Sequence, residues 1–84
     1  MTSIEVAEAV EREGVKLFRP TTGKEHQYDV KDFFSGSKRG WVALDAMSAS
    51  AILAVYRALR DDLKPRFVAW SPQRQAHFAW KYVK

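Results

Sequence analysis

The sequence predicts an α+β fold in which an N-terminal helix and a β-hairpin precede a compact set of three helices. The run from Leu44 to Arg60 has almost no charge and places apolar side chains around most of a helix, which is typical of a central, buried helix. Two short segments rich in strand-forming residues flank a turn that contains proline and glycine. The 84 residues, of which 46% are hydrophobic, suffice for a single small globular domain over residues 1–84.

The first helix is expected over residues 3–13. Thr2 and Glu5 stand three residues apart, as in a capping box, and Gly14 follows as a residue that can adopt a positive φ. Glutamates recur at every third position on the polar side of this helix. They form either a solvated face or a set of ligands for a metal or a basic partner, and the solvated face is the simpler interpretation.

A two-stranded antiparallel hairpin is expected after this helix. Residues 15–19 and 26–30 provide its strands, and residues 20–23 provide a turn in which proline fixes φ and glycine permits a positive φ. A lone hairpin is marginal in water, so we expect it to pack on helices. His26 would begin the second strand as a partly exposed residue, because no metal-ligating residue stands at ligand spacing from it.

The segment after the hairpin combines two phenylalanines with a basic loop. Phe33 and Phe34 are expected to anchor a turn of helix in the core. Residues 35–40, with the sequence SGSKRG, form either a simple mobile connection or a phosphate site made of backbone N–H groups, although the spacing of a P-loop is absent. Residues 41–44 form either a short strand or an extended lead into the central helix.

The central helix is expected to run from Ser48, which we prefer over Asp45 as its N-cap, to Arg60. We expect this helix, including Val55, to lie at the centre of the core. The side chains expected to pack around it are Val10, Leu17, Tyr28, Phe34, Trp41, Phe67 and Trp80.

Two more helices are expected to complete the domain. The first covers residues 63–70, with Pro65 in its first turn, and the second covers residues 72–83, with Ser71 as N-cap and Pro72 as first residue. The last helix has an apolar side with Ala76, Ala79, Trp80 and Val83. A basic side faces the opposite way, with Arg74, His77, Lys81 and Lys84.

The formal net charge is +4, and the charges are unevenly distributed. Residues 1–13 carry four Glu and one Arg, whereas residues 63–84 carry five Lys or Arg and no acidic residue. A basic C-terminal quarter suggests an anionic partner such as nucleic acid, an acidic protein face or a membrane surface, although basic segments also keep small proteins soluble. No apolar run is long enough to span a membrane, so we expect no membrane partner.

The sequence offers little for catalysis. It has no cysteine, which excludes disulfides, thiolate nucleophiles and cysteine zinc sites and fits a cytoplasmic protein. The acidic N-terminus lacks the basic region of a signal peptide. His26 and His77, brought near Asp29 or Asp45, are the one arrangement that would supply acid–base groups. We therefore expect a non-catalytic protein without a cofactor.

The basic side of the last helix and the basic loop are the best candidates for a binding surface. We predict nucleic-acid binding through Lys38, Arg39, Arg74, His77, Lys81 and Lys84. Aromatic residues are interleaved with these charges and either stack on bases or belong to the core. A helix-turn-helix at residues 61–62 is disfavoured, because that turn lacks glycine and Pro65 follows it. The alternative function is a protein-interaction module that docks through an apolar and aromatic surface.

The pattern of apolar and turn residues over Thr21–Leu59, followed by KPRF at residues 64–67 and FAWKYVK at residues 78–84, resembles small uncharacterised proteins of actinobacterial phages and related mobile elements. The similarity covers about two thirds of the chain and includes no chemical motif. It implies an accessory protein made in the cytoplasm of an infected host, and it assigns no catalytic or binding residue.

Overall fold

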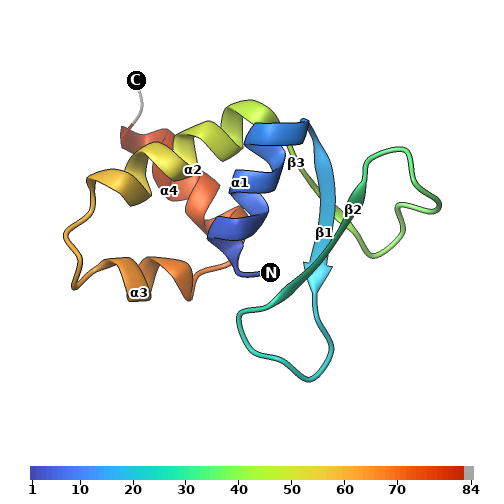
Figure 1. Cartoon of the computed structure of the whole chain (residues 1–84), viewed down its shortest axis with the longest axis horizontal. Coiled ribbons are helices and arrows are strands. Elements are labelled where there is room, and N and C mark those ends of the chain that lie inside the picture. Colours follow the sequence, from blue (N-terminus) through green and yellow to red (C-terminus); the bar gives the residue numbers. More distant parts are fainter. Residues whose placement is uncertain (83–84) are drawn as a thin grey trace.

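The computed structural model describes residues 1–82 and has the α+β architecture that the sequence predicts (Figure 1). The helices are grouped together, and a small antiparallel sheet lies beside them. The elements in chain order are α1 (Ser3–Glu13), β1 (Lys16–Pro20), β2 (Tyr28–Asp32), β3 (Val42–Leu44), α2 (Ala46–Ala58), α3 (Lys64–Val68) and α4 (Pro72–Tyr82).

The sheet has three strands in the order β2-β1-β3. The expected hairpin is present, and of the two structures considered for residues 41–44 the strand is the one observed. Phe18 lies opposite Val30 on one side and Val42 on the other. Both outer strands are antiparallel to β1, so they run parallel to each other, and the loop of residues 33–41 must cross one face of the sheet to join β2 to β3.

The expected end signals of α1 are present. The Thr2 side chain accepts from the backbone N–H of Glu5 at 3.2 Å, and the Glu5 carboxylate accepts from the Thr2 N–H at 2.9 Å. Gly14 has a φ of 95° and donates its N–H to the carbonyl of Val10. The same hydrogen bonds to Thr2 hold the pKa of Glu5 below its ordinary value.

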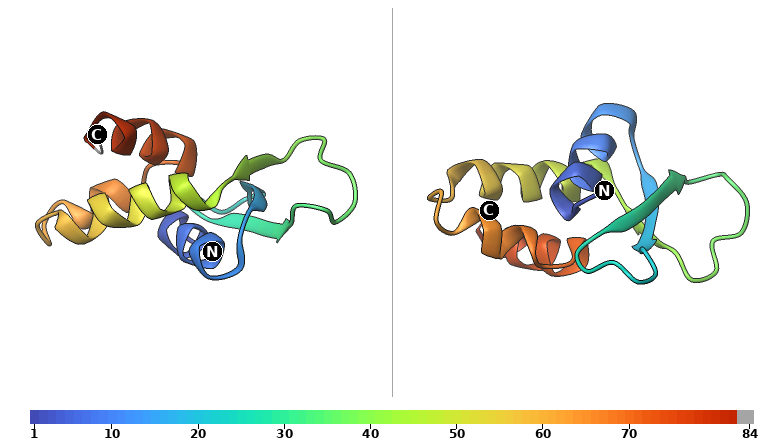
Figure 2. Two further views of the ribbon diagram at one scale, coloured as in Figure 1. Left: turned by 90° about the horizontal axis from the view of Figure 1, so that it is seen from above. Right: turned by 60° about the horizontal axis from the view of Figure 1, so that its bottom comes forward.

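The central position of α2 is confirmed, but its expected limits are wrong. Figure 2 (left) shows α2 between α1 and α4. Ala49, Ile52 and Leu53 are almost completely buried, whereas Val55 is only partly buried. The helix begins at Ala46 because the Asp45 carboxylate accepts from the N–H of Ser48 at 2.7 Å, and it ends at Ala58 rather than Arg60.

Three of the seven side chains expected around α2 belong to the core cluster: Val10, Tyr28 and Phe67. Leu17 is buried, but on the opposite face of the sheet from Phe18 and outside that cluster. The other three contradict the expectation. Phe34 is 89% exposed because the chain leaves the sheet after Asp32 in a series of turns rather than a helix. Trp80 is 44% exposed at the edge of α4, and Trp41 packs against charged side chains beside the sheet.

A buried polar network fixes the first turn of α1 to the C-terminal helices. Gln75 is completely buried, and its Nε2 donates to Ser3 Oγ at 2.6 Å and to the Phe67 carbonyl at 2.7 Å. Ser3 Oγ in turn donates to the Val68 carbonyl at 3.0 Å. Buried hydrogen bonds of this kind are directional, so they set the position of α1 relative to α3 and α4.

Lys16 joins the end of α1 to β2. Its Nζ lies 2.6 Å from Asp32 Oδ1 and 3.0 Å from Glu13 Oε1. Hydrogen bonds to Asp32 and then to Glu13 raise the pKa of Lys16, and the pKa of Glu13 is lowered by Lys16 and Arg12. A positive charge at position 16 is therefore favoured in the folded state.

Replacing Ile52 with aspartate is expected to abolish cooperative folding. An unpaired buried carboxylate costs several kcal/mol, which is comparable with the total stability of about 5–15 kcal/mol of a small domain. Ala54→Asp is the matched control, because Ala54 is exposed on the same helix. Thermal unfolding followed by circular dichroism checks the result. A cooperative transition of Ile52→Asp near that of the control would contradict the central role of α2.

Replacing Lys16 with methionine is expected to remove a contribution to folding stability that the wild-type protein itself loses at alkaline pH. The pKa of Lys16 is raised on folding, so its contribution is complete below the ordinary lysine value of 10.5 and is lost as the pH rises through the raised pKa. Tyr28, whose pKa burial also raises, affects both proteins alike. Urea unfolding from about pH 8 to about pH 12 should show the stability difference between wild type and variant shrinking. A constant difference would contradict a role for the charge.

Candidate functional site

Ion pairing divides the cations of the described residues into two classes. Six Lys and Arg side chains lie within ion-pair distance of a described carboxylate: Arg12, Lys16, Arg19, Arg57, Arg60 and Lys64. The remaining seven form no such pair in residues 1–82: Lys24, Lys31, Lys38, Arg39, Arg66, Arg74 and Lys81. These seven side chains are the ones available to an anionic ligand.

Three of the unpaired cations belong to one cluster at the sheet end of the molecule. We call it the loop cluster, and it consists of Arg19, Lys31, Phe33, Phe34, Lys38, Arg39 and Trp41. The loop of residues 33–41 projects from the sheet on the side away from α3 and α4 (Figures 1 and 2). Between Asp32 and Asp45 the chain has no acidic residue, so the loop carries uncompensated positive charge.

Trp41 is held between the loop and the strands. The Arg19 guanidinium lies 4.4 Å from the centre of a Trp41 ring, and Lys31 Nζ lies 4.5 Å from it. Lys31 is the cross-strand partner of Leu17, and Arg19 stands two residues from Leu17, so both cations lie on the same face of the sheet. Arg19 is also paired with Asp29, whose pKa is held low by hydrogen bonds from Thr21 and Arg19.

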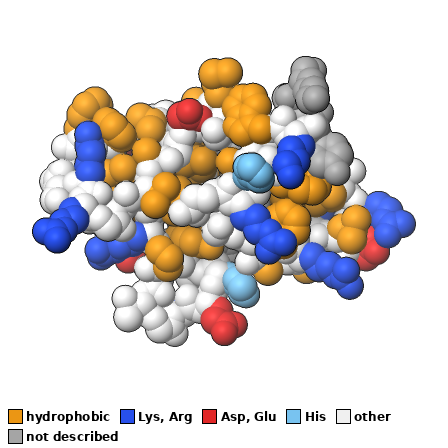
Figure 3. Space-filling view, turned by 180° about the vertical axis from the view of Figure 1, so that it is seen from behind, with side chains coloured by type: hydrophobic (Ala, Val, Ile, Leu, Met, Phe, Trp, Pro, Cys, Tyr) orange, Lys and Arg blue, Asp and Glu red, His pale blue; other side chains and the backbone are white. Residues whose placement is uncertain are grey.

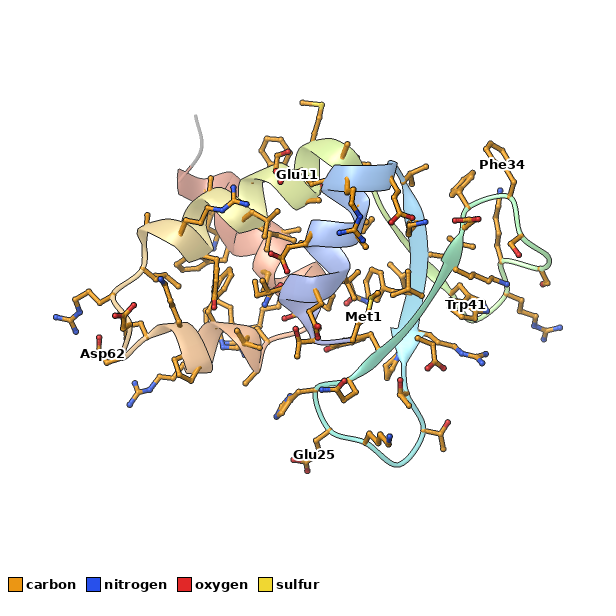
Figure 4. All side chains as sticks on the ribbon, viewed as in Figure 1. Met1, Glu11, Glu25, Phe34, Trp41 and Asp62 are labelled. Atoms are coloured by element: carbon orange, nitrogen blue, oxygen red, sulfur yellow. The ribbon has the colours of Figure 1, made fainter. Side chains whose placement is uncertain are left out.

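The two phenylalanines lie further out on the loop. Their rings meet edge to face with centres 5.1 Å apart, and Lys38 Nζ lies 3.8 Å from the centre of the Phe33 ring. Figure 4 shows Phe34 on the outer part of the loop, away from the helices, with Trp41 nearer the strands. An exposed aromatic ring beside cations is a surface that can stack on a planar group while the cations bind an anion.

Local hydrogen bonds define the shape of the loop. Lys31 Nζ donates to the Ser37 carbonyl at 2.6 Å, the Arg39 N–H donates to Ser37 Oγ, and the Trp41 N–H donates to the Lys38 carbonyl. The backbone N–H groups of Arg39 and Trp41 are therefore engaged within the loop. The side-chain cations of the loop, rather than these backbone N–H groups, are therefore the groups that can bind a phosphate.

The second group of cations lies on α4. Arg74, His77 and Lys81 are exposed and share one side of the helix, as the sequence predicts. The Arg74 guanidinium lies 4.0 Å from the centre of a Trp70 ring, and Ser71 Oγ accepts from the Arg74 N–H as the expected N-cap. Lys84 lies outside the described residues. Figure 3 shows the face of the molecule seen from behind, where basic and hydrophobic side chains are interspersed.

The structure does not bring the two basic groups onto one surface. Lys38 and Arg39 lie in the loop at one end of the molecule, whereas the α4 group lies over the helices (Figures 1 and 2). Two aromatic residues expected beside these charges belong mainly to the core, because Trp70 and Phe78 pack edge to face at 5.3 Å and both contact Phe67. The sequence did not assign Phe34, Arg19 or Lys31 to a binding surface.

An apolar groove lies between α2 and α4. It has a volume of about 440 Å³ and is lined by Ala46, Met47, Ser50, Ala51, Ala54 and Trp80. Met47 is 71% exposed, and the indole N–H of Trp80 donates to Ser48 Oγ at 3.4 Å. Small residues at positions 46, 50 and 54 recur every fourth residue, which leaves a shallow lane along α2. This spacing is visible in the sequence, but only the fold shows that the lane is uncovered.

The histidines do not form a catalytic arrangement in the described part of the chain. His26 lies in the turn before β2 with a φ of 57°, and not in the strand where it was expected. No described hydrogen bond or ion pair joins His26 or His77 to a carboxylate. Residues 1–82 also contain no cluster of three or more His, Asp or Glu side chains arranged to hold a metal ion.

Comparison with protein-family models, curated proteins and solved structures found no match. Within residues 1–82, no helix combines the length and the hydropathy that crossing a membrane requires.

Proposed function

We propose that this chain is a non-catalytic protein that binds nucleic acid through the loop cluster. The observation that carries the proposal is the combination of cations without a carboxylate partner, Lys31, Lys38 and Arg39, with the exposed ring of Phe34. Such cations bind the phosphates of nucleic acids, and exposed aromatic rings stack on the faces of the bases. The proposed setting is the cytoplasm of an infected host, as the resemblance to phage proteins implies.

The α4 group supplies a second set of phosphate contacts in this proposal. Arg74, His77 and Lys81 present donors on one side of a helix, and the ring of Trp70 restrains the Arg74 side chain. Because the loop cluster and α4 lie apart, a bound strand would contact them at different points along its length. The net charge of +4 is modest, so aromatic contacts have to contribute to affinity beside the phosphates.

Charge reversal in the loop is expected to remove binding without unfolding the domain. Lys38→Glu with Arg39→Glu eliminates two cations that have no acidic partner. The slope of log affinity against log salt is negative, and each phosphate that is no longer neutralised reduces its magnitude by about 0.7–0.9. Arg74→Glu with Lys81→Glu tests the second set of phosphate-binding cations in the same way. Fluorescence anisotropy of a labelled oligonucleotide at several salt concentrations measures both effects.

The control variant undergoes the same change in net charge as these variants, but at other positions. Lys24→Glu with Arg66→Glu also lowers the net charge from +4 to 0, at two exposed positions that have no carboxylate partner in the described part of the chain and lie outside both basic groups. Lys16 is unsuitable because it is buried between two carboxylates. Equal weakening by all three double variants would show that only total charge acts, and the site assignment would then be wrong.

The groove between α2 and α4 favours a second candidate function, docking onto protein. We propose a second copy of this chain as its occupant. The lane of small side chains admits a helix at close approach, and α2 of a second copy presents the same lane. Two copies packed with their α2 helices against each other would cover both lanes and bury both exposed Met47 side chains.

Met47→Glu is expected to eliminate this self-association. A carboxylate in the groove would be desolvated opposite an apolar surface, whereas the exposed position of Met47 in the single chain leaves folding intact. Sedimentation velocity over a range of concentrations gives the mass of wild type and variant. A wild-type chain that stays monomeric at the highest concentration contradicts a second copy as the occupant.

A further inference from the structure

We infer that the ligand of the loop cluster is single-stranded nucleic acid and that Phe34 stacks on one of its bases. The inference rests on the proposed function and adds the class of nucleic acid and the residue that selects it. Phe34 is 89% exposed, the largest exposed fraction among the large hydrophobic side chains of residues 1–82. A side chain this exposed contributes little to the core of the protein.

The surroundings of Phe34 restrain its ring and leave most of its surface exposed to solvent. Phe33 meets it edge to face with ring planes at 88°, which fixes the ring from one side. Lys38 Nζ lies over the ring of Phe33, 3.8 Å from its centre, and 5.8 Å from the centre of Phe34. A nucleotide whose base stacks on Phe34 would therefore have its phosphate close to Lys38. An apolar protein side chain packed on Phe34 would offer no anion to Lys38.

The accessibility of the base faces distinguishes single-stranded from double-stranded nucleic acid as the ligand. In a duplex each base face is covered by its neighbours, so an exposed ring finds no surface to stack on unless a base is flipped out. In a single strand the faces are open, and stacking on aromatic side chains supplies much of the affinity irrespective of sequence. Among the described side chains near the α4 cations, Trp70 is covered by Arg74 and packs on Phe67 and Phe78, and Trp80 is only 44% exposed.

The test compares a fluorescent single-stranded DNA of about 15 nucleotides with the duplex of the same sequence by anisotropy. We expect the wild type to bind the single strand more tightly. Phe34→Ala should lower that affinity about fivefold to a hundredfold, with the salt slope unchanged because the same phosphates remain neutralised. Thr22→Ala, which removes an exposed side chain in the hairpin turn outside both basic groups, should leave the affinity unchanged. Phe34→Trp should retain binding, and its added fluorescence should be quenched by the stacked base.

The outcomes separate this inference from the proposed function. If the duplex binds as tightly as the single strand, or if Phe34→Ala binds like wild type while Lys38→Glu with Arg39→Glu does not, base stacking is wrong and nucleic-acid binding stands. If neither oligonucleotide binds, both proposals fail. If the emission of Phe34→Trp shifts with vesicles of anionic lipid and not with oligonucleotides, the loop is a membrane contact and both proposals are overturned.

Discussion

The fold depends on the burial of one helix between two others. Ala49, Ile52 and Leu53 of α2 are nearly inaccessible to water, and α1, the sheet and α4 all contribute to the cluster around them. A chain of 84 residues has material for only one core, so each remaining element has to reach α2 or the inner face of the sheet. The hydrogen bonds of Gln75 then restrict how α1 and the C-terminal helices can slide on that core.

The sequence was sufficient for most of the fold, because local signals coincide with the global arrangement. The capping box at Thr2 and the N-cap at Ser71 each specify a boundary through chemistry that acts within a few residues. The hairpin was predicted, but its strands lie one to two residues later than expected, because Pro20 is the last residue of β1 and β2 begins at Tyr28. The start of α2 was misplaced because Asp45 and Ser48 are both good N-caps, and the intervening residues tolerate a helix in either case. Nothing local distinguishes the two.

The candidate site was less predictable, because its grouping depends on long-range placement. The exposure of Lys38, Arg39, Arg74 and Lys81 follows from their charge, but the separation of the loop from α4 follows from the strand order. Phe34 was expected in the core since most phenylalanines are buried, and hydropathy carries no information about where a loop leaves a sheet. The three tryptophans illustrate the same point: one packs on the core, one lies under two cations, and one borders a groove.

The return of the chain across the sheet has a consequence for how binding and folding are linked. The loop joins β2 to β3, and β3 is only three residues long, so its pairing with β1 has few hydrogen bonds to sustain it. A ligand that binds only the folded loop also keeps the start of β3 paired with β1 at Phe18. Its binding free energy therefore stabilises this edge of the sheet. The β3 amides that donate to β1 thus report on binding, because their exchange with solvent slows as the occupancy of the loop cluster rises.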